Sequence, residues 1–488
     1  MSLKKFITTP IFYPNDKPHI GHTYTCVIAD ILARYYKQNG YEVILSTGVD
    51  EHGQKIAKTA AKHNLQPQEW VDNMAQVFKN MMHAFKIDYS IFVRTTSSEH
   101  KKAVEQFWNT LNANGYIYKG LYNGWYDVSD ENFVKDDEID ETTITVHTAH
   151  PSVKSAKTGL GKNVIWVEEE CYFFKLSAFT QTLTNHYNKT PQAILPQSRL
   201  NEIKGFLKQG LNDIAISRTS VKWGIEVPNN PNHTVYVWID ALVNYLTCLG
   251  YPNKDFGDFW ENSIHILGKD IVKFHAIYWP AFLNAADISY PHALLTHGWW
   301  ITDKEKMSKS LGNIIDPMQL LETYSCEELR WFFVREMIVG QDACFSYQRL
   351  NVRCLELSNV IGNLVQRSVS LLLKKHQGKV LELDALMEDQ KIDIQKFINA
   401  ANNAMEELKV HLYAQAIFDL AVECNVYIDQ HKPWSNLDSQ LILSNIIYAL
   451  RALCTLLKPI MPSTAILIQE ALKFNTIQAL PILFPRRT

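Results

Sequence analysis

The sequence predicts an α/β protein, in which a Rossmann-type parallel sheet is split by an inserted domain and followed by an α-helical bundle. Three observations lead to this prediction. The first 50 residues read as strand, helix and strand. From about Gly115 the chain becomes acidic and then β-like. After about Phe345 the β-like patterns fade and helical periodicity takes over. With 488 residues, the chain is long enough for about three domains.

The first βαβ unit accounts for the N-terminal part of the sheet. Residues 5–13 favour a strand, which the turn-forming Pro14-Asn15-Asp16 ends. Apolar residues recur at helical spacing from Val27 to Tyr35, and Gly40 ends that helix. Residues 41–48 favour the next strand. Such a unit is typical of parallel sheets that bind nucleotides.

The rest of the chain follows in four further segments. Residues 55–114 are mostly helical, with a short strand at 88–95, and sheet-like patterns resume at Thr234–Ile239 and Ile264–Gly268. Helical periodicity covers residues 355–375, 391–412, 412–429 and 439–457. The expected segments are residues 1–114 and 231–295 for the two halves of the sheet domain, 115–230 for the insertion, 296–350 for a connecting region and 351–488 for the helical domain.

Composition argues against several classes of protein. The net charge of −3 argues against a protein that coats nucleic acid nonspecifically. The longest uncharged run, 288–302, is shorter than the ~20 apolar residues that a membrane span needs. None of the eight cysteines forms a C-x-x-C pair, which argues against a zinc knuckle. The N-terminus has no apolar signal core, so we expect a soluble, cytoplasmic protein.

Pro18-His19-Ile20-Gly21-His22 stands where the first strand meets the first helix. A helix start presents free N–H groups and the positive end of a dipole, which attract phosphate. Two imidazoles there could donate hydrogen bonds to phosphoryl oxygens as charge builds on them. Gly21 would let a flat ring lie against the backbone. A bare helix cap is the alternative explanation for the same pattern.

Lys304-Glu-Lys306-Met307-Ser308-Lys309-Ser310 is the second motif, and its lysines alternate with small polar residues before Gly312. Such a composition indicates a mobile cationic loop, which could close over a triphosphate and neutralise charge in a transition state. Taken alone, it could equally be an ordinary solvated loop.

Together the two motifs resemble the HIGH and KMSKS signatures of class I aminoacyl-tRNA synthetases. Within that class the chain resembles the methionyl-tRNA synthetases over essentially its whole length. The resemblance is carried by five further segments, which are Tyr13–His22, Thr47-Gly-Val-Asp50-Glu-His-Gly, Val237-Trp238-Ile-Asp240-Ala241, Gly268-Lys-Asp270-Ile-Val-Lys-Phe-His275 and His431-Lys-Pro-Trp434. An insertion of ~115 residues is also too short for the large editing domain of the isoleucine, valine and leucine enzymes.

The resemblance implies that methionine attacks ATP to give methionyl-adenylate, and that the methionyl group then passes to the 3′ end of tRNA(Met). It implies His19, His22, Lys306 and Lys309 as catalytic residues, which bind ATP together with Gly21, Gly268 and Asp270. Asp50 would take the ammonium group of methionine, as an anion at the end of a parallel strand. The other implied methionine-binding residues are Ile11, Tyr13, Trp238, Ala241, Tyr245, Ile271 and His275.

The resemblance also divides the rest of the chain by role. It implies a connective-peptide insertion at 115–230, a KMSKS and stem-contact region at 296–350, and an anticodon-binding domain at 351–488. In that domain, Trp434 would stack on an unpaired anticodon base and Asn359 would contact a base edge. Magnesium is expected to accompany ATP, because of the charge on the triphosphate.

Two departures from the family lead to further expectations. Many relatives hold zinc in the insertion, but residues 115–230 contain only Cys171. We therefore expect no structural zinc and an insertion ordered by apolar packing of Trp125, Tyr126, Trp166, Tyr172, Phe173 and Phe174. The additional C-terminal tRNA-binding module of some relatives, which also supports dimerisation, has no counterpart here, so we expect a monomer.

Three alternatives remain at this level. A class I synthetase for cysteine or valine would share both signatures. A small-molecule adenylyltransferase would share the first motif, but such enzymes are much shorter. A non-catalytic RNA-binding relative would have no physical reason to keep His19, His22, Asp50, Lys306 and Lys309 together.

Overall fold

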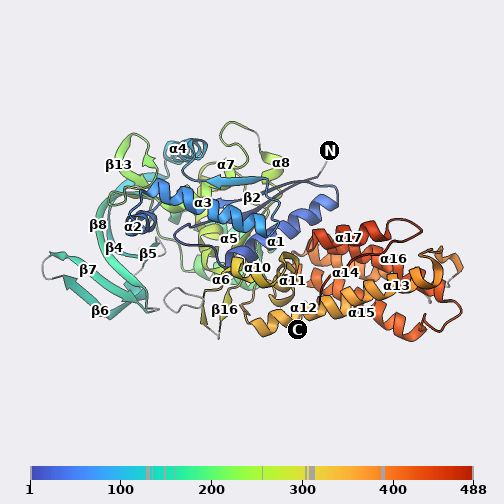
Figure 1. Ribbon diagram of the computed structural model, residues 1–488. Coiled ribbons are helices and arrows are strands. Elements are labelled where there is room, and N and C mark those ends of the chain that lie inside the picture. The colour runs from blue at the N-terminus through green and yellow to red at the C-terminus, as the bar shows by residue number, and fades with distance from the viewer. Residues whose placement is uncertain are drawn as a thin grey trace.

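The computed structural model describes residues 3–127, 132–134, 136–147, 150–159, 161–254, 256–302, 305–306, 314–385 and 391–485. The molecule is elongated (Figure 1). The inserted strands lie at one end, the parallel sheet and its helices lie in the middle, and the helical bundle forms the other end.

A six-stranded parallel sheet forms the centre of the molecule. Its order is β3-β2-β1-β14-β15-β9, and every neighbouring pair is parallel. The strands are β1 (Lys4–Phe12), β2 (Glu42–Val49), β3 (Ile91–Arg94), β9 (Ile194–Leu195), β14 (Ser263–Gly268) and β15 (Ala293–His297). Strands β2 and β3 follow β1 on one side of it, whereas β14 and β15 lie on the other side of β1. Ligands bind outside the carboxyl ends of the strands at such a reversal of strand order.

Helices cover both faces of this sheet. Successive side chains of a strand point to opposite faces. Phe6 and Ile7 of β1 accordingly belong to two different cores. The core around Ile7 contains α1 (Ile20–Gln38) and α3 (Pro67–Ala84), and it continues into the helical bundle. The core around Phe6 contains α4 (Ser98–Ala113), α7 (Val237–Thr247) and α9 (Trp279–Ala285). The sheet domain and the bundle therefore share one continuous apolar core.

The Rossmann-type class is confirmed, but the strand expected at Thr234–Ile239 is wrong. Residues Asn230–Val235 form β13, which pairs antiparallel with β11 (Ser217–Arg218) and β12 (Glu226–Val227) outside the parallel sheet. Helix α7 begins directly afterwards at Val237. Its residues 239–246 are all buried, so its apolar run has no polar face. A short apolar run of this kind does not separate a buried strand from a buried helix.

The insertion contains an antiparallel sheet in the order β5-β4-β8-β7-β6, with β10 (Ile214–Ala215) beside β8. Its strands are β4 (Ile117–Asp127), β5 (Asn132–Val134), β6 (Ile139–His147), β7 (His150–Thr158) and β8 (Asn163–Phe174). The rings of Trp125 and Trp166 pack edge to face at 5.1 Å in a small separate core. Of the residues expected to pack in the insertion, Trp125 and Trp166 lie in this small core, whereas Phe174 lies in the core around Phe6.

The division of the chain into five segments stays a prediction, and one stretch inside the expected insertion belongs with the parallel sheet in space. Residues Thr180–Lys189 (α5) and Gln197–Lys208 (α6) flank β9, which pairs with β15 as the edge strand of the sheet. Leu183 and Leu200 lie in the core around Phe6. With two residues, β9 is too short to show a periodic pattern.

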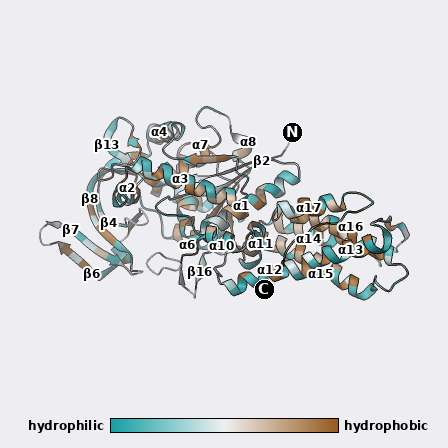
Figure 2. Cartoon of the chain, in the orientation of Figure 1, coloured by the Kyte–Doolittle hydropathy of each residue, from teal (hydrophilic) through white to brown (hydrophobic). Residues whose placement is uncertain are grey.

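The C-terminal helices match the predicted periodicity. They are α12 (Tyr347–Glu356), a π-helical turn (Leu357–Gly362), α13 (Asn363–His376), α14 (Ile394–Glu406), α15 (Val410–His431), α16 (Ser439–Leu457) and α17 (Pro462–Leu472). Figure 2 shows apolar residues gathered between these helices and polar residues on their outer faces. Helix α16 is long and apolar enough to cross a membrane by length and composition, but 67% of its most apolar window is buried inside the structure.

Candidate active site

The predicted site residues of the sheet domain gather at the carboxyl edge of the three central strands. Ile11 lies near the end of β1, where it is paired in register with Gly48 of β2. Asp50 follows β2, and its N–H donates to the Phe12 carbonyl at 2.9 Å. Gly268 ends β14, which pairs with β1 on the other side. Residues from three separate parts of the chain thus meet at the reversal of strand order, as the prediction requires.

His19 and His22 begin helix α1 and cap it together. The Gly21 N–H donates to His19 Nδ1 at 3.0 Å, and the His19 N–H donates to His22 Nδ1 at 3.1 Å. The two rings stack with their centroids 3.9 Å apart. Since both Nδ1 atoms accept, each neutral ring carries its proton on Nε2. A capping role and a phosphate-binding role are therefore compatible, because capping uses Nδ1 of each ring while Nε2 carries the proton.

The environment of His22 keeps its ring neutral. Phe12 and Phe78 pack against the ring edge to face at 5.0 and 5.6 Å. Burial, with a smaller contribution from neighbouring His19, lowers the pKa of His22 well below its ordinary value. At neutral pH His22 therefore acts as a neutral hydrogen-bond donor.

Aromatic residues of the predicted methionine pocket connect α7 to the segment after β14. The ring of Trp238 stacks on Phe274 at 3.7 Å. The Tyr245 hydroxyl lies 2.8 Å from His275 Nε2, and His275 Nδ1 lies 3.0 Å from the Ile271 carbonyl. Because a carbonyl only accepts, Nδ1 carries the proton and the Tyr245 hydroxyl donates to Nε2. Burial lowers the pKa of His275 to about 4, so this arrangement holds at neutral pH.

The structure brings the other predicted methionine-binding residues to the same region. Ala241 lies on α7 between Trp238 and Tyr245, and Ile271 lies in the short helix Lys269–Ile271. Tyr13 follows β1, where the Lys55 ammonium lies 5.6 Å from its ring. Soft, polarisable thioether sulfur packs favourably against aromatic rings. The composition of this pocket therefore suits a methionine side chain.

At two glycines, a predicted ATP-binding side chain packs directly against the backbone. A Cβ added at Gly21 would lie 2.8 Å from the His19 ring, and one added at Gly268 would lie 2.6 Å from Asp270 Oδ1. Any side chain at either position would displace a predicted ATP-binding residue. The requirement for glycine at both positions is thus steric.

Several polar and aromatic residues near the site, of which His297 and His265 are buried, were not identified from the sequence. His297 ends β15, and its Nε2 lies 2.8 Å from Thr25 Oγ1 of α1. The Trp299 indole N–H donates to Asp270 Oδ1 at 3.2 Å. His265 lies beneath Tyr245, with ring centroids 4.1 Å apart. Position at the end of a strand was the one available signal for His297, and no local pattern marked the other two.

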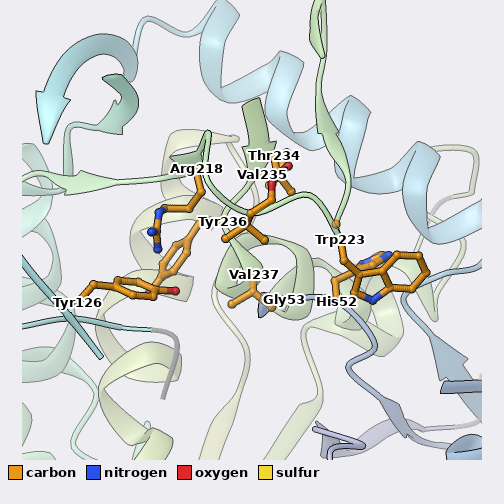
Figure 3. A pocket seen from close by; sticks show the side chains of 11 residues that line it. His52, Gly53, Tyr126, Arg218, Trp223, Thr234, Val235, Tyr236 and Val237 are labelled. Carbon is orange, nitrogen blue, oxygen red and sulfur yellow. Dashed lines mark hydrogen bonds between the residues drawn. The ribbon is translucent and has the colours of Figure 1, made fainter. Parts of the chain in front are cut away.

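Beside the pocket, His52 and His100 both contact the buried carboxylate of Asp240. Among the described residues, no group of three or more His, Cys, Asp or Glu could hold a metal ion. A narrow cavity lies next to this cluster and is lined by His52, Trp223, Val237, Tyr126 and Arg218 (Figure 3).

The lysine-rich loop and the helical domain are described only in part. The backbone of Lys306 pairs with Ile301 through β17 (Glu305–Lys306) and β16 (Trp300–Thr302), and Lys309 lies outside the described residues. Trp434 is 46% exposed after α15, and Lys375 Nζ donates to its carbonyl at 2.6 Å. Asn359 is exposed on the π-helical turn. It lies 16 residues before Lys375, so on the order of 20 Å of helix separates the two predicted anticodon contacts.

Comparison with known proteins agrees with this arrangement. Residues 5–369 match the family model of class I tRNA synthetases (M), and residues 393–477 match an anticodon-binding domain of tRNA ligases. The methionine–tRNA ligase of Rickettsia bellii is 43% identical, over 97% of this chain and 94% of that protein. The chain belongs to the methionyl-tRNA synthetase family. Its activity is therefore methionine–tRNA ligation.

Other relatives extend this agreement. The methionine–tRNA ligase of Listeria monocytogenes is 38% identical, over 94% of this chain and 71% of that protein. A structure of Mycobacterium tuberculosis methionyl-tRNA synthetase in complex with methionyl-adenylate superimposes with a TM-score of 0.91 at 34% identity, and covers 99% of this chain and all of that one. The identity over both domains argues against the shorter adenylyltransferases.

Proposed function

We propose that the residues at the carboxyl edge of the parallel sheet activate methionine with ATP, and that the helical domain binds the tRNA that receives the methionyl group. One observation carries this proposal. The histidine pair that caps α1, the carboxylate of Asp50 after β2 and the aromatic residues of α7 lie together where the strand order reverses. Reactions at phosphorus need charge stabilisation and alignment more than a protein nucleophile. The histidine pair would supply the charge stabilisation, and the acidic strand end and the aromatic pocket would supply the alignment.

ATP would lie over the start of α1. The Nε2–H groups of His19 and His22 would donate to phosphoryl oxygens, where charge builds as methionine attacks the α-phosphate. Without side chains, Gly21 and Gly268 would let the nucleotide lie against the backbone, and Asp270 would bind the ribose. Lys306 and Lys309 would neutralise the departing pyrophosphate, and magnesium would arrive on the triphosphate as part of the substrate.

Methionine would lie between Asp50 and α7. The Asp50 carboxylate would bind its ammonium group, and this orients the carboxylate of methionine toward the α-phosphate. Its thioether would fill the pocket formed by Ile11, Tyr13, Trp238, Ala241, Tyr245, Ile271 and His275. The Tyr245 hydroxyl donates to His275, so this polar pair is already satisfied within the pocket.

The helical domain would bind the anticodon of tRNA(Met). Trp434 would stack on one unpaired base, and Asn359 would contact a different nucleotide, because the helix separates these residues. We further propose a monomeric, cytoplasmic enzyme that needs no structural zinc, as the sequence predicts. Light scattering of the purified protein tests the monomeric state, and metal analysis tests the expectation of no structural zinc.

Methionine-dependent exchange of pyrophosphate into ATP tests the assignment of the activation site. The wild-type protein should show strong exchange with methionine, and little with cysteine or valine. Asp50→Ala should reduce the exchange by at least about 100-fold, because an ammonium group that loses its charged partner costs several kcal/mol. Asp258→Ala, which removes a surface carboxylate paired with Lys4, is the matched control and should retain full activity. Full exchange by Asp50→Ala would refute the role of Asp50.

A further inference from the structure

A buried triad of two histidines and an aspartate lies behind the methionine pocket. His52 Nδ1 is 2.6 Å from Asp240 Oδ2, and His100 Nε2 is 2.8 Å from Asp240 Oδ1. Each of the three side chains is at least 97% buried. Each carboxylate oxygen therefore has its own histidine partner. None of these residues contributes to the chemistry described above.

The triad connects three elements that are far apart in the sequence. His52 belongs to the loop after β2, Asp240 to α7 and His100 to α4. His100 contacts α7 a second time, since its Nδ1 lies 3.0 Å from Thr247 Oγ1. The loop carries Asp50 two residues before His52, and α7 carries three of the predicted pocket residues. The triad thus joins the ammonium-binding side of the methionine site to its thioether-binding side.

The helical repeat explains how Asp240 acts without touching methionine. Trp238, Ala241 and Tyr245 follow the i, i+3, i+7 spacing and share one face of α7. Asp240 and Thr247 lie on the other side, where α4 packs. The pocket residues therefore face the substrate, while the triad holds the back of the same helix.

The loop that carries His52 is also fixed from its outer side. The Trp223 indole N–H donates to the Glu51 carbonyl at 2.6 Å, and the Gly53 N–H donates to the Trp223 carbonyl at 3.0 Å. The rings of His52 and Trp223 pack edge to face at 5.4 Å (Figure 3). With the loop held on this side by Trp223 and on the other by Asp240, the position of Asp50 relative to α7 is set by these contacts.

We propose that Asp240, held by His52 and His100, is a positioning residue for methionine, which sets the distance between Asp50 and the aromatic pocket on α7. The inference rests on the proposed methionine site. Packing alone does not call for such a group, since apolar side chains of similar volume often stabilise a core as well as a buried charged cluster does. Hydrogen bonds to both carboxylate oxygens, in contrast, are directional, so they restrain the rotation of α7 about its axis and its translation along that axis.

Substrate-specific kinetics test the proposal. Asp240→Asn keeps the shape of the side chain, but its amide must donate to one histidine where the carboxylate accepted. In the exchange assay, we expect the KM for methionine to rise about 10- to 100-fold, because a shift of about 1 Å at a substrate contact has effects of this size. The KM for ATP should stay within about twofold. His52→Gln and His100→Gln should produce the same split to a smaller extent.

Asp30→Asn is the matched control, because Asp30 is an equally buried aspartate with two basic partners, at the junction with the helical domain. It should lower stability and leave the KM for methionine unchanged. An unchanged KM for methionine in folded Asp240→Asn, or an equal rise in both KM values, would overturn the positioning role. If Asp240→Asn does not fold, His100→Gln decides by the same criterion.

The wild-type protein and Asp50→Ala, measured in the same assay, separate the test of the proposed methionine site from the test of the positioning role of Asp240. Exchange by the wild-type protein that depends on Asp50 supports the methionine site, whatever Asp240→Asn does. No methionine-dependent exchange by the wild-type protein would instead overturn the proposed site itself.

Discussion

Asp240 and Asp30 are two buried aspartates that the molecule uses in different ways. Asp240 has two histidine partners and lies inside the catalytic domain. Asp30 of α1 has two arginine partners, Arg34 at 2.8 Å and Arg330 at 2.6 Å. Arginine keeps its charge at every accessible pH and presents several N–H donors in a fixed planar geometry. The comparison indicates that permanently charged arginines join the two domains at Asp30, while two histidines orient the aspartate behind the substrate site.

The role of Asp30 follows from the contacts of Arg330. This guanidinium also donates to the carbonyls of Pro459 and Ile460, which link α16 to α17, and to the carbonyl of Phe85 after α3. The buried side chain of Arg330 thereby connects α1, which His19 caps, to the anticodon-binding domain. Since α1 carries the histidine pair, the placement of that pair depends on this junction.

Removing Arg330 should produce the largest loss of stability among these predictions. It tests whether the buried arginine holds the two domains together. Arg330→Met leaves Asp30 with one arginine partner and leaves three buried carbonyls without this donor. We expect the free energy of unfolding to fall by about 3–5 kcal/mol. Urea titration followed by circular dichroism measures this change.

Arg349→Met is the control for this prediction. Arg349 pairs with Glu336, but 56% of its side chain is exposed. Exposed ion pairs contribute about 0–1 kcal/mol, so this variant should unfold near the wild-type urea concentration. Equal losses in the two variants would show that burial of Arg330 does not strengthen the junction.

Acid should weaken the Asp240 triad by an intermediate amount. Burial opposes ionisation of this carboxyl, but the charge of His52 and the hydrogen bonds from both histidines outweigh that effect and lower its pKa to about 2. A carboxyl with a lowered folded-state pKa stabilises the protein above its unfolded pKa of about 3.9, and that stability is lost as the pH falls toward 2.

The expected size of this contribution is about 2 kcal/mol, lost between about pH 5 and pH 2. Urea unfolding of the wild-type protein and of Asp240→Asn across this range measures it. The difference in stability between the two proteins should shrink steadily as the pH falls. A difference in stability that stays constant with pH would show that the pKa of Asp240 is not lowered in the folded protein.

Trp434→Ala should have the smallest energetic effect of these changes. It tests whether the helical domain acts in tRNA charging alone and not in methionine activation. Stacking of one base contributes about 1–3 kcal/mol, and the partial exposure of this indole suggests the lower end of the range. We expect kcat/KM for tRNA charging to fall about 10-fold, with methionine-dependent exchange unchanged. Phe474→Ala, which removes another exposed ring of the bundle, should leave both activities intact. Equal loss of both activities in Trp434→Ala would contradict the division of labour.

Local patterns predicted most of the architecture. The first strand, α1 and β2 follow directly from residues 5–48, because alternation and helical spacing are properties of neighbouring residues. The helices of the bundle were predicted for the same reason. The position of His19 and His22 at a helix start was also correct, since Pro18 and the preceding strand mark that start in the sequence.

Long-range packing decided the features that these patterns missed. Val237–Ile239 reads as a strand but begins α7, because the core around Phe6 buries this helix on every side. Two residues of the expected insertion become the edge strand β9 through pairing with β15, about 100 residues later. Neither outcome leaves a signal within one window of sequence.

The same distinction applies to the candidate site. The residue types needed for ATP and methionine are visible in short motifs, because each motif lies on one loop or at one helix start. The pairing of His52 and His100 with Asp240 spans 188 and 140 residues, and it exists only when β2, α4 and α7 pack together. Short-range chemistry can be read along the chain, whereas a buried charge acquires its partners only when separate elements enclose it and exclude water.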